Sequence, residues 1–353
     1  MTTMKDVAER ANVSSKTVSR VLRNDRYVTD GIRERVMAAV RELNYLPNML
    51  AVTFRSGREG AIGVAVPDIA DPFFASVIKA VEVEARLHQT AVIVTSLGYE
   101  PDHEQDAVET LLRRQITGLI SCPVSPDQSY LRPWQDRTAM VFIDRSPKRL
   151  TADSVVEDDL GGARAAVEHL LAHGHSRIAF VGDTARLSTT LLRLKGYRAA
   201  LKDAGHEPDD SLIYLGSTAT ASVDDALGAL ADLDLPPTAV FSSNARCTLD
   251  LVPAMQRLAL RETSIVSFGD FPMAQSLRPA ITVIDQSPDE VGRLAAERLF
   301  LRIAEPNRRL RRRTMLPVSL VERDSCKPLV GASLPERPKL ATTTLRPVGH
   351  RSA

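Results

Sequence analysis

The sequence predicts an α/β protein in which three short helices precede a body built from two parallel β-sheets. Apolar residues recur at helical spacing in three segments before residue 46. Beyond them, eight short apolar runs, from AIGVAVP at residues 61–67 to SIVSFGD at residues 264–270, are mostly separated by amphipathic helical segments. Such alternation gives parallel sheets with helices on both faces. The series divides into two sheets near residues 150–160, and a strand around 317–321 is expected to return the chain across the hinge of this two-lobed body.

The N-terminal segment, residues 1–46, has the pattern of a helix-turn-helix domain. Thr3 and Asp6 have the spacing of a capping box at the start of the first helix, and Ser14 or Ser15 can cap the second. A third helix is expected at about residues 30–44. The apolar residues form one stripe on each of the first two helices: Val7, Ala8 and Ala11, then Val18, Val21 and Leu22.

The second helix leaves hydroxyls and cations outside its apolar stripe, namely Ser15, Lys16, Thr17, Ser19 and Arg20. Short hydroxyl donors and long cations are the groups that bond base edges and phosphates. Taken alone, one such helix is better explained as a solvated amphipathic helix with no ligand, so a DNA-binding role depends on the other features of the chain.

Charge is segregated along the chain although the formal net charge is only +1. Residues 1–58 carry 11 Lys/Arg against 6 Asp/Glu, and residues 307–353 carry 11 against 3. The segment between them is therefore acidic. A basic N-terminal module on an acidic body is typical of nucleic-acid binding.

Composition limits the class of protein. With 353 residues, 44% hydrophobic and 25% charged, the chain is expected to be globular, and it contains no apolar stretch long enough for a membrane span. Its polar N-terminus is unlike a signal peptide. The three widely spaced cysteines, Cys122, Cys247 and Cys326, favour a reducing cytoplasm over a disulfide or zinc framework.

Several motifs together resemble the lac repressor (LacI-type) family. MKDVAERANVSSKTVSRVL and ELNYLPN lie in the N-terminal segment, and IGVAVPD, DPFFASVIKAVE, EHLLAHGHSRIAFVGD, RLKGYRAAL, VSFGD and LPVSLVERDS follow in the same order through residue 325. The resemblance implies a dimeric transcription regulator whose body, residues 61–325, is similar to periplasmic sugar-binding proteins. It also implies double-stranded operator DNA and a sugar-like effector as partners, a homodimer or tetramer, and no cofactor. The Pro-rich residues 326–353 are expected to form a disordered tail.

For DNA, the resemblance implies that Lys16 and Arg20 contact base edges, whereas Thr17 and Ser19 contact phosphates. Residues 47–60 would form a hinge helix that orders on DNA. Phe54 stands where the family has a leucine wedge in the minor groove, and Phe is also an intercalating type. The remaining residues assigned to the DNA contact are Thr3, Ser15, Arg26, Tyr45 and Asn48.

Polar residues follow several predicted strands, at the edge where ligands bind in such folds: Asp68, Asp71, Asp144, Arg145, Asp183, Asn244 and Asp270. Each can equally be a helix cap. The resemblance assigns Asp144, Arg193, Asn244 and Asp270 to the effector, with Arg145 beside them and Phe73 and Phe74 at the aromatic edge of the pocket. Two departures are notable: Ala245 replaces a usual aspartate, and Leu187 replaces the arginine of purine-responsive members.

Other functions find less support in the sequence. The chain has no Walker loop, GxSxG, HExxH or dinucleotide fingerprint, so we do not expect an enzyme. A sugar-binding protein without a regulatory role, or a regulator with a nucleoside or other metabolite as effector, remains open. NRRLRRR at 307–313 is expected to be a solvated loop. His169, His173 and His175 are expected to mark a helix C-terminus rather than a metal site.

Overall fold

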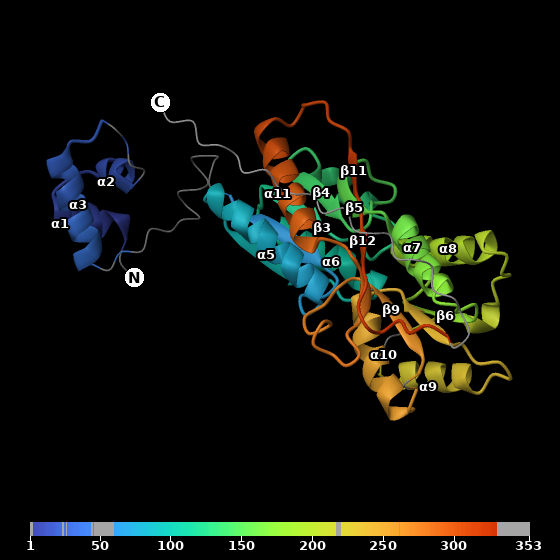
Figure 1. The fold of residues 1–353 in the computed structure, drawn as a ribbon. Helices are drawn as coiled ribbons and strands as arrows, with labels where there is room; N and C mark the ends of the chain where they lie inside the picture. Colours follow the sequence, from blue (N-terminus) through green and yellow to red (C-terminus); the bar gives the residue numbers. More distant parts are fainter. Residues whose placement is uncertain are drawn as a thin grey trace, which may run out of the picture. The chain divides into compact units, whose positions relative to one another are not determined.

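The computed structural model describes residues 3–22, 25, 27–43, 45, 60–216, 220–260 and 262–329. Its chain divides into two compact units, residues 1–60 and residues 61–353 (Figure 1). The α/β class and the two sheets predicted from the sequence are confirmed. Among the described residues, no helix is both long and apolar enough to cross a membrane.

The first unit contains α1 (Met4–Ala11), α2 (Ser15–Leu22) and α3 (Asp30–Glu42) around a small apolar core. The predicted capping box is present, because Thr3 N–H donates to the Asp6 carboxylate and Asp6 N–H donates to the Thr3 hydroxyl. Ser14, rather than Ser15, caps α2 by accepting from Thr17 N–H at 3.1 Å. The three helices therefore form the helix-turn-helix arrangement, with Tyr45 buried against them.

One lobe of the second unit is a six-stranded parallel sheet in the order β11-β5-β4-β3-β1-β2. Its strands are β1 (Ile62–Val66), β2 (Val92–Ser96), β3 (Gly118–Ser121), β4 (Ala139–Ile143), β5 (Asp153–Glu157) and β11 (Arg313–Leu316). Its helices are α5 (Pro72–Leu87), α6 (Glu104–Leu112) and α11 (Pro288–Ala304), with 3₁₀ turns at Pro101–His103 and Ser129–Trp134. Alternate strand residues enter two cores, one under α5 and α11 and the other under α6. This alternation explains why its central strands have near-continuous apolar sequences.

The other lobe has the strand order β12-β10-β9-β8-β6-β7, in which only β12 is antiparallel to its neighbour. Its strands are β6 (Ile178–Gly182), β7 (Ile213–Leu215), β8 (Ala239–Ser242), β9 (Ser264–Phe268), β10 (Thr282–Asp285) and β12 (Ser319–Val321). Its helices are α7 (Asp159–Ala172), α8 (Ser188–Asp203), α9 (Thr220–Ala231) and α10 (Ala245–Arg257), with a 3₁₀ turn at Asp210–Leu212. The helices α7 and α8 cover one face of this sheet, and α9 and α10 cover the other.

The chain passes between the lobes three times: after β5, after β10 and after β11. The strand expected around 317–321 corresponds to β12, which joins the second sheet, whereas β11, which closes the first sheet just before it, was not predicted. The carboxyl ends of the parallel strands of both sheets therefore meet at the crossings, where the fold leaves a site for polar groups.

The ordered body continues past the expected boundary at residue 325, which corrects the extent of the predicted tail. Cys326 is buried in the core of the second lobe. Lys327 N–H donates to the Ser264 hydroxyl, and Leu329 N–H donates to the carbonyl of His173. These contacts fix residues 326–329 because their backbone groups find partners on the body, whereas residues 330–353 lie outside the described residues.

Two helical glycines allow a direct test of the packing between α5 and α11. A Cβ on Gly292 would overlap the carbonyl oxygen of Val77 and approach the Cβ of Ala80 to 2.8 Å, whereas a Cβ on Gly228 of α9 would meet nothing within 4 Å. Gly292→Ala should therefore lower the free energy of unfolding by about 1–3 kcal/mol. Gly228→Ala should raise it by up to about 1 kcal/mol, because alanine is the better helix former. Urea unfolding followed by circular dichroism measures both, and equal effects of the two substitutions would contradict the close packing of α5 and α11.

Candidate functional site

A narrow cavity lies between the two lobes, at the carboxyl ends of their strands. Its volume is about 50 Å³, which is room for a few water molecules. The first lobe contributes aromatic and charged residues, and the second contributes the start of α8 and the start of α10. The lining residues are Asp71, Phe73, Phe74, Tyr99, Asp144, Arg145, Asp183, Leu187, Thr189, Thr190, Arg193, Asn244, Ala245, Arg246 and Gln286.

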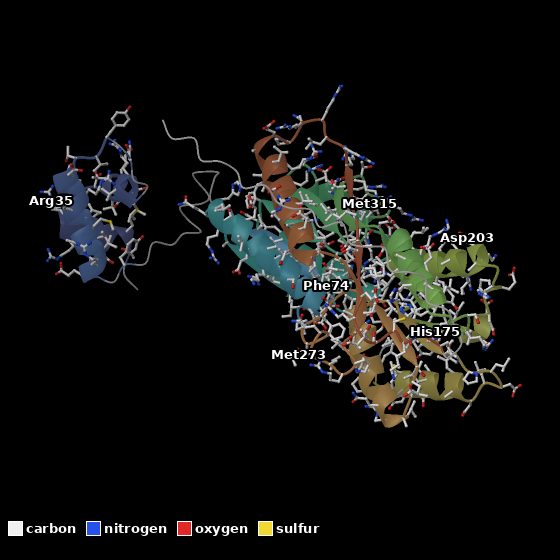
Figure 2. The ribbon with its side chains drawn as sticks, viewed as in Figure 1. Arg35, Phe74, His175, Asp203, Met273 and Met315 are labelled. Atoms are coloured by element: carbon white, nitrogen blue, oxygen red, sulfur yellow. The ribbon has the colours of Figure 1, made fainter. Side chains whose placement is uncertain are left out.

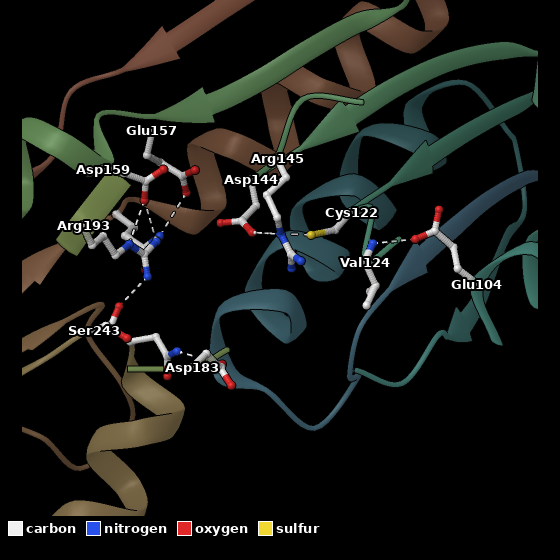
Figure 3. Close-up of polar contacts among 12 residues, drawn as sticks. Glu104, Cys122, Val124, Asp144, Arg145, Glu157, Asp159, Asp183, Arg193 and Ser243 are labelled. Atoms are coloured by element: carbon white, nitrogen blue, oxygen red, sulfur yellow. Dashed lines mark hydrogen bonds and ion pairs between the residues drawn. The ribbon is translucent and has the colours of Figure 1, made fainter. Parts of the chain in front are cut away.

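A buried ion pair forms the wall of the cavity on the first lobe. Asp144 directly follows β4 with a left-handed backbone (φ 61°), and its carboxylate accepts from Nε of Arg145 at 2.9 Å. The thiol of Cys122, at the end of β3, donates to the same carboxylate at 3.5 Å (Figure 3). Nη1 of Arg145 is buried and has no hydrogen-bond partner among the described residues. Arg145 therefore has a donor available beside the cavity.

Arg193 holds the opposite wall together (Figure 3). From α8, its guanidinium contacts Asp159 at 2.7 Å, donates to the carbonyl of Ser243 at 2.6 Å and lies 3.8 Å from the ring centroid of Phe268. It thereby ties together α7, α8 and two strand ends. Since three of these contacts are internal, Arg193 is a structural clamp as well as a lining residue.

A second cluster joins the start of α10 to both lobes. Asn244 caps α10 by accepting from Cys247 N–H at 2.7 Å, and its amide donates to Asp183 at 3.1 Å. Arg246 pairs with the same Asp183 and lies 4.0 Å from the ring centroid of Tyr99 in the other lobe. The hydroxyl of Tyr99 is buried and has no partner among the described residues. This cluster therefore links the lobes while leaving one hydroxyl available.

Two carboxyls at the crossing after β5 have raised pKa values. Burial raises the pKa of Asp159 to about 6, although Arg193 opposes the shift. Burial, and then the charges of Asp144 and Asp159, raise the pKa of Glu157 well above its usual value. Glu157 also accepts from the amide of Gln286, which lies at the crossing after β10. The crossings are thus joined by buried polar contacts.

The structure brings six of the seven predicted effector residues to this cavity: Phe73, Phe74, Asp144, Arg145, Arg193 and Asn244. Asp270 is the exception and corrects the expectation of one shared site. It lines a neighbouring cavity with Phe73 and Gln286, and both its oxygens pair with the guanidinium of Arg323. No local sequence pattern indicates this ion pair, because 53 residues separate Asp270 from Arg323. The binding roles of all seven stay predictions.

Sequence reasoning missed several lining residues: Tyr99, Thr189, Thr190, Arg246 and Gln286. One local signal was present, because Arg246 comes two residues after the strand-end Asn244, in the first turn of a helix. Tyr99 and Gln286 gave no such signal, since each follows its strand within an irregular segment.

In the first unit, the predicted DNA-contacting residues of α2 share the side away from the core. Ser15, Lys16 and Arg20 are exposed, and Thr17 and Ser19 are partly exposed. Nε of Arg20 donates to Asp25 at 2.9 Å, which orients the guanidinium beside α2.

Three residues of the first unit outside α2 also carry predictions. The hydroxyl of Thr3 accepts from Asp6 N–H as the cap of α1. Tyr45 is only 8% exposed and packs in the core, which favours a structural role over the predicted DNA contact. Arg26, Asn48 and Phe54 lie outside the described residues.

Comparison with known proteins identifies the family. Residues 3–48 match the model of bacterial regulatory proteins of the lacI family, and residues 167–326 match that of the periplasmic binding protein-like domain. The chain is 30% identical to the ribose operon repressor of Escherichia coli, over 92% of this chain and 100% of that protein. The chain belongs to the lacI family. As a member, it is a DNA-binding transcriptional regulator.

Other members of the lacI family support the same assignment. The HTH-type transcriptional repressor CytR of Escherichia coli is 32% identical over 83% of this chain and 87% of that protein. The crystal structure of the lac repressor dimer bound to operator and the anti-inducer ONPF is similar, with a TM-score of 0.80 and 27% identity. That match covers 92% of this chain and 99% of the repressor chain.

The raised pKa of Asp159 predicts a specific pH dependence. Its folded pKa of about 6 lies above its ordinary value of 3.8, so the folded state holds the proton more tightly. The associated stability is present below about pH 4 and is lost as the pH rises through 6, by about 3 kcal/mol at most. Asp159→Asn has no such titration. Urea unfolding from pH 4 to pH 7 should therefore show a steeper loss of stability in the unmodified chain, whereas parallel profiles would contradict the burial of this carboxyl.

Proposed function

We propose that the chain is a homodimeric repressor of a carbohydrate-utilisation operon, that α2 reads the operator, and that a sugar bound in the interlobe cavity controls it. Its action is regulation rather than catalysis, and it takes place in the bacterial cytoplasm, where operator DNA is found. The ribose operon repressor and the lac repressor dimer among its relatives support this proposal.

One observation carries the assignment of the effector site. Among the described residues, only five buried side-chain polar atoms have no hydrogen-bond partner, and two of them, the hydroxyl of Tyr99 and Nη1 of Arg145, belong to residues that line this cavity. A buried polar group without a partner costs about 1–3 kcal/mol, and a hydroxylated ligand removes that cost by supplying the partner. The carboxylates and threonine hydroxyls nearby suit the remaining hydroxyls of a sugar. Phe73 and Phe74, packed edge to face at 5.1 Å, offer an apolar wall.

The contacts between lobes suggest how the effector acts. Arg246 stacks on Tyr99, and Arg186 pairs with Glu100 at 3.3 Å, so both arginines of the second lobe contact the first. The present volume of about 50 Å³ is too small for a monosaccharide, so the lobes or these side chains must move apart. A sugar that binds one arrangement of the lobes more tightly than the other shifts the balance between them.

An effector with an aromatic base is the second candidate, because Phe73 and Phe74 offer ring faces. Leu187, which lines the cavity, stands where the resemblance implies an arginine in purine-responsive members, and this favours the sugar. Calorimetry with monosaccharides and with nucleosides separates the two classes directly.

Tyr99→Phe should reduce sugar affinity about tenfold and raise the free energy of unfolding by about 1–3 kcal/mol, because it removes a buried polar group that has no partner among the described residues. Removal of this hydroxyl therefore breaks no hydrogen bond within the described part of the chain, while the ring that contacts Arg246 remains. Isothermal calorimetry and urea unfolding of the full chain measure the two quantities.

Tyr197→Phe is the matched control. The hydroxyl of Tyr197 donates to the carbonyl of Ile178 at 2.7 Å in the core. Its loss should lower stability by about 1–2 kcal/mol and leave sugar affinity unchanged. Unchanged affinity in Tyr99→Phe would remove that hydroxyl from the binding site.

Arg20→Ala should weaken binding to the operator by about 1–3 kcal/mol and reduce sequence preference, because a base contact carries specificity. Arg35→Ala, which removes an exposed cation from α3 (Figure 2), is the matched control. It should weaken binding to the operator and to random DNA by the same factor, because it removes only sequence-independent attraction to the phosphates. Fluorescence anisotropy with an operator selected by the unmodified chain gives both values, and equal losses of specificity in the two variants would contradict the assignment of α2.

The predicted wedge, Phe54, lies outside the described residues and remains a prediction. Phe54→Ala should reduce bending of the operator without changing the stability of residues 61–325, since the two units are separate. A circular-permutation gel assay measures the bend, and an unchanged bend would contradict the insertion.

A further inference from the structure

The last turn of α7 and the segment after β12 bring two imidazoles and a thiol together. His169 lies in the last turn of α7, His173 is its C-cap one turn further on, and Cys326 comes from the segment that was expected to be a tail. One ligand atom from each of these residues lies within 4.8 Å of the other two. The group belongs to the second lobe and shares no residue with the interlobe cavity.

The hydrogen bonds of the two histidines leave Nε2 of each ring available to bind a metal ion. Nδ1 of His173 lies 2.8 Å from the carbonyl oxygen of His169. A carbonyl can only accept, so Nδ1 carries the proton and Nε2 of His173 keeps its lone pair. A backbone carbonyl in this position is the usual outer contact of a metal-bound histidine. Nε2 of His169 is buried and has no hydrogen-bond partner among the described residues.

The cysteine is held in place independently of any ion. Lys327 N–H donates to the Ser264 hydroxyl at 2.9 Å, and Leu329 N–H donates to the carbonyl of His173 at 3.0 Å. The third histidine of the sequence motif, His175, is excluded from the group. Its two ring nitrogens contact Thr238 at 3.0 Å and the carbonyl of Lys327 at 2.8 Å.

We propose that His169, His173 and Cys326 bind one Zn²⁺ ion, through Nε2 of each histidine and the thiolate. Tetrahedral zinc holds such atoms about 3.3–3.7 Å apart, so the group needs to contract by about 1 Å. His169 and His173 are partly exposed, which gives the ion a path from solvent. The fourth position is open to water or a carboxylate. The bound ion fixes the segment after β12 against α7.

The donor set selects the kind of metal. Two imidazoles and a thiolate suit zinc and exclude Mg²⁺ and Ca²⁺, which require oxygen ligands.

Cobalt is the probe for the experiment, since Co²⁺ occupies zinc sites and its bond to a thiolate produces a near-ultraviolet charge-transfer band. The full chain, reduced and freed of metal with a chelator, is titrated with Co²⁺ and then with Zn²⁺. We expect one Co²⁺ per chain with the charge-transfer band and tetrahedral visible bands, and loss of both when Zn²⁺ is added. Zn²⁺ should also raise the melting temperature.

Cys326→Ser should abolish the charge-transfer band and weaken Zn²⁺ binding at least tenfold. Cys247→Ser and His206→Gln are the matched controls, a buried thiol and an exposed imidazole elsewhere in the same lobe, and should bind as the unmodified chain does. His173→Gln keeps the buried thiol and should also weaken binding at least tenfold. It tests the proposal even if Cys326→Ser fails to fold.

Three results would overturn the proposal. These are the absence of the band in the unmodified chain, its persistence in Cys326→Ser, and Zn²⁺ binding by His173→Gln as tight as that of the unmodified chain. Sugar and operator affinities of these variants are measured separately, so failure of the zinc site leaves the regulatory function untouched.

Discussion

The body depends on one constraint: the chain crosses three times between its two sheets. Parallel strands end on the same edge, so the crossings after β5, β10 and β11 bring the polar ends of both sheets into one narrow space. The carboxylates in that space are shielded from bulk water, so they need hydrogen-bond or ion-pair partners. Arg145 and Arg193 supply them from opposite lobes, and Gln286 joins one crossing to another through Glu157. The arrangement of these ion pairs and hydrogen bonds therefore defines the cavity.

The sequence predicts most strands because they are apolar runs, whereas the strands β5, β10 and β11 contain charged or polar residues and were not predicted. It indicates caps because each lies beside its helix. Thr3, Asp71 and Asn244 are examples, since a cap needs only its neighbours. Contacts between distant segments are different, because no local pattern encodes them. The pairing of Asp270 with Arg323 removed one predicted residue from the shared cavity. The stacking of Arg246 on Tyr99 added two that the pattern did not indicate.

The end of the body shows the same limit. Its Pro-rich sequence predicts disorder from residue 326, yet Cys326 lies in an apolar core and its neighbours bond to β9 and α7. The prediction that the histidines mark a helix C-terminus is confirmed, since α7 ends at Ala172 with His173 as its C-cap. The cysteine of the proposed zinc site is about 150 residues away in sequence, so no local pattern indicated it. A metal site assembled from one helix and one distant cysteine becomes visible only when the chain is folded. The proposed zinc site lies within the second lobe, whereas the proposed sugar site lies between the two lobes, and the two share no residue.

Coupling between the cavity and α2 is the central claim, and thermodynamic linkage tests it most directly. Operator affinity of the full chain is measured with and without saturating sugar, and sugar affinity is measured with and without operator. If the sugar controls the regulator, the two affinities change by the same factor, at least fivefold, because coupling is reciprocal. If calorimetry shows that the sugar binds but operator affinity does not change, the proposed coupling is contradicted.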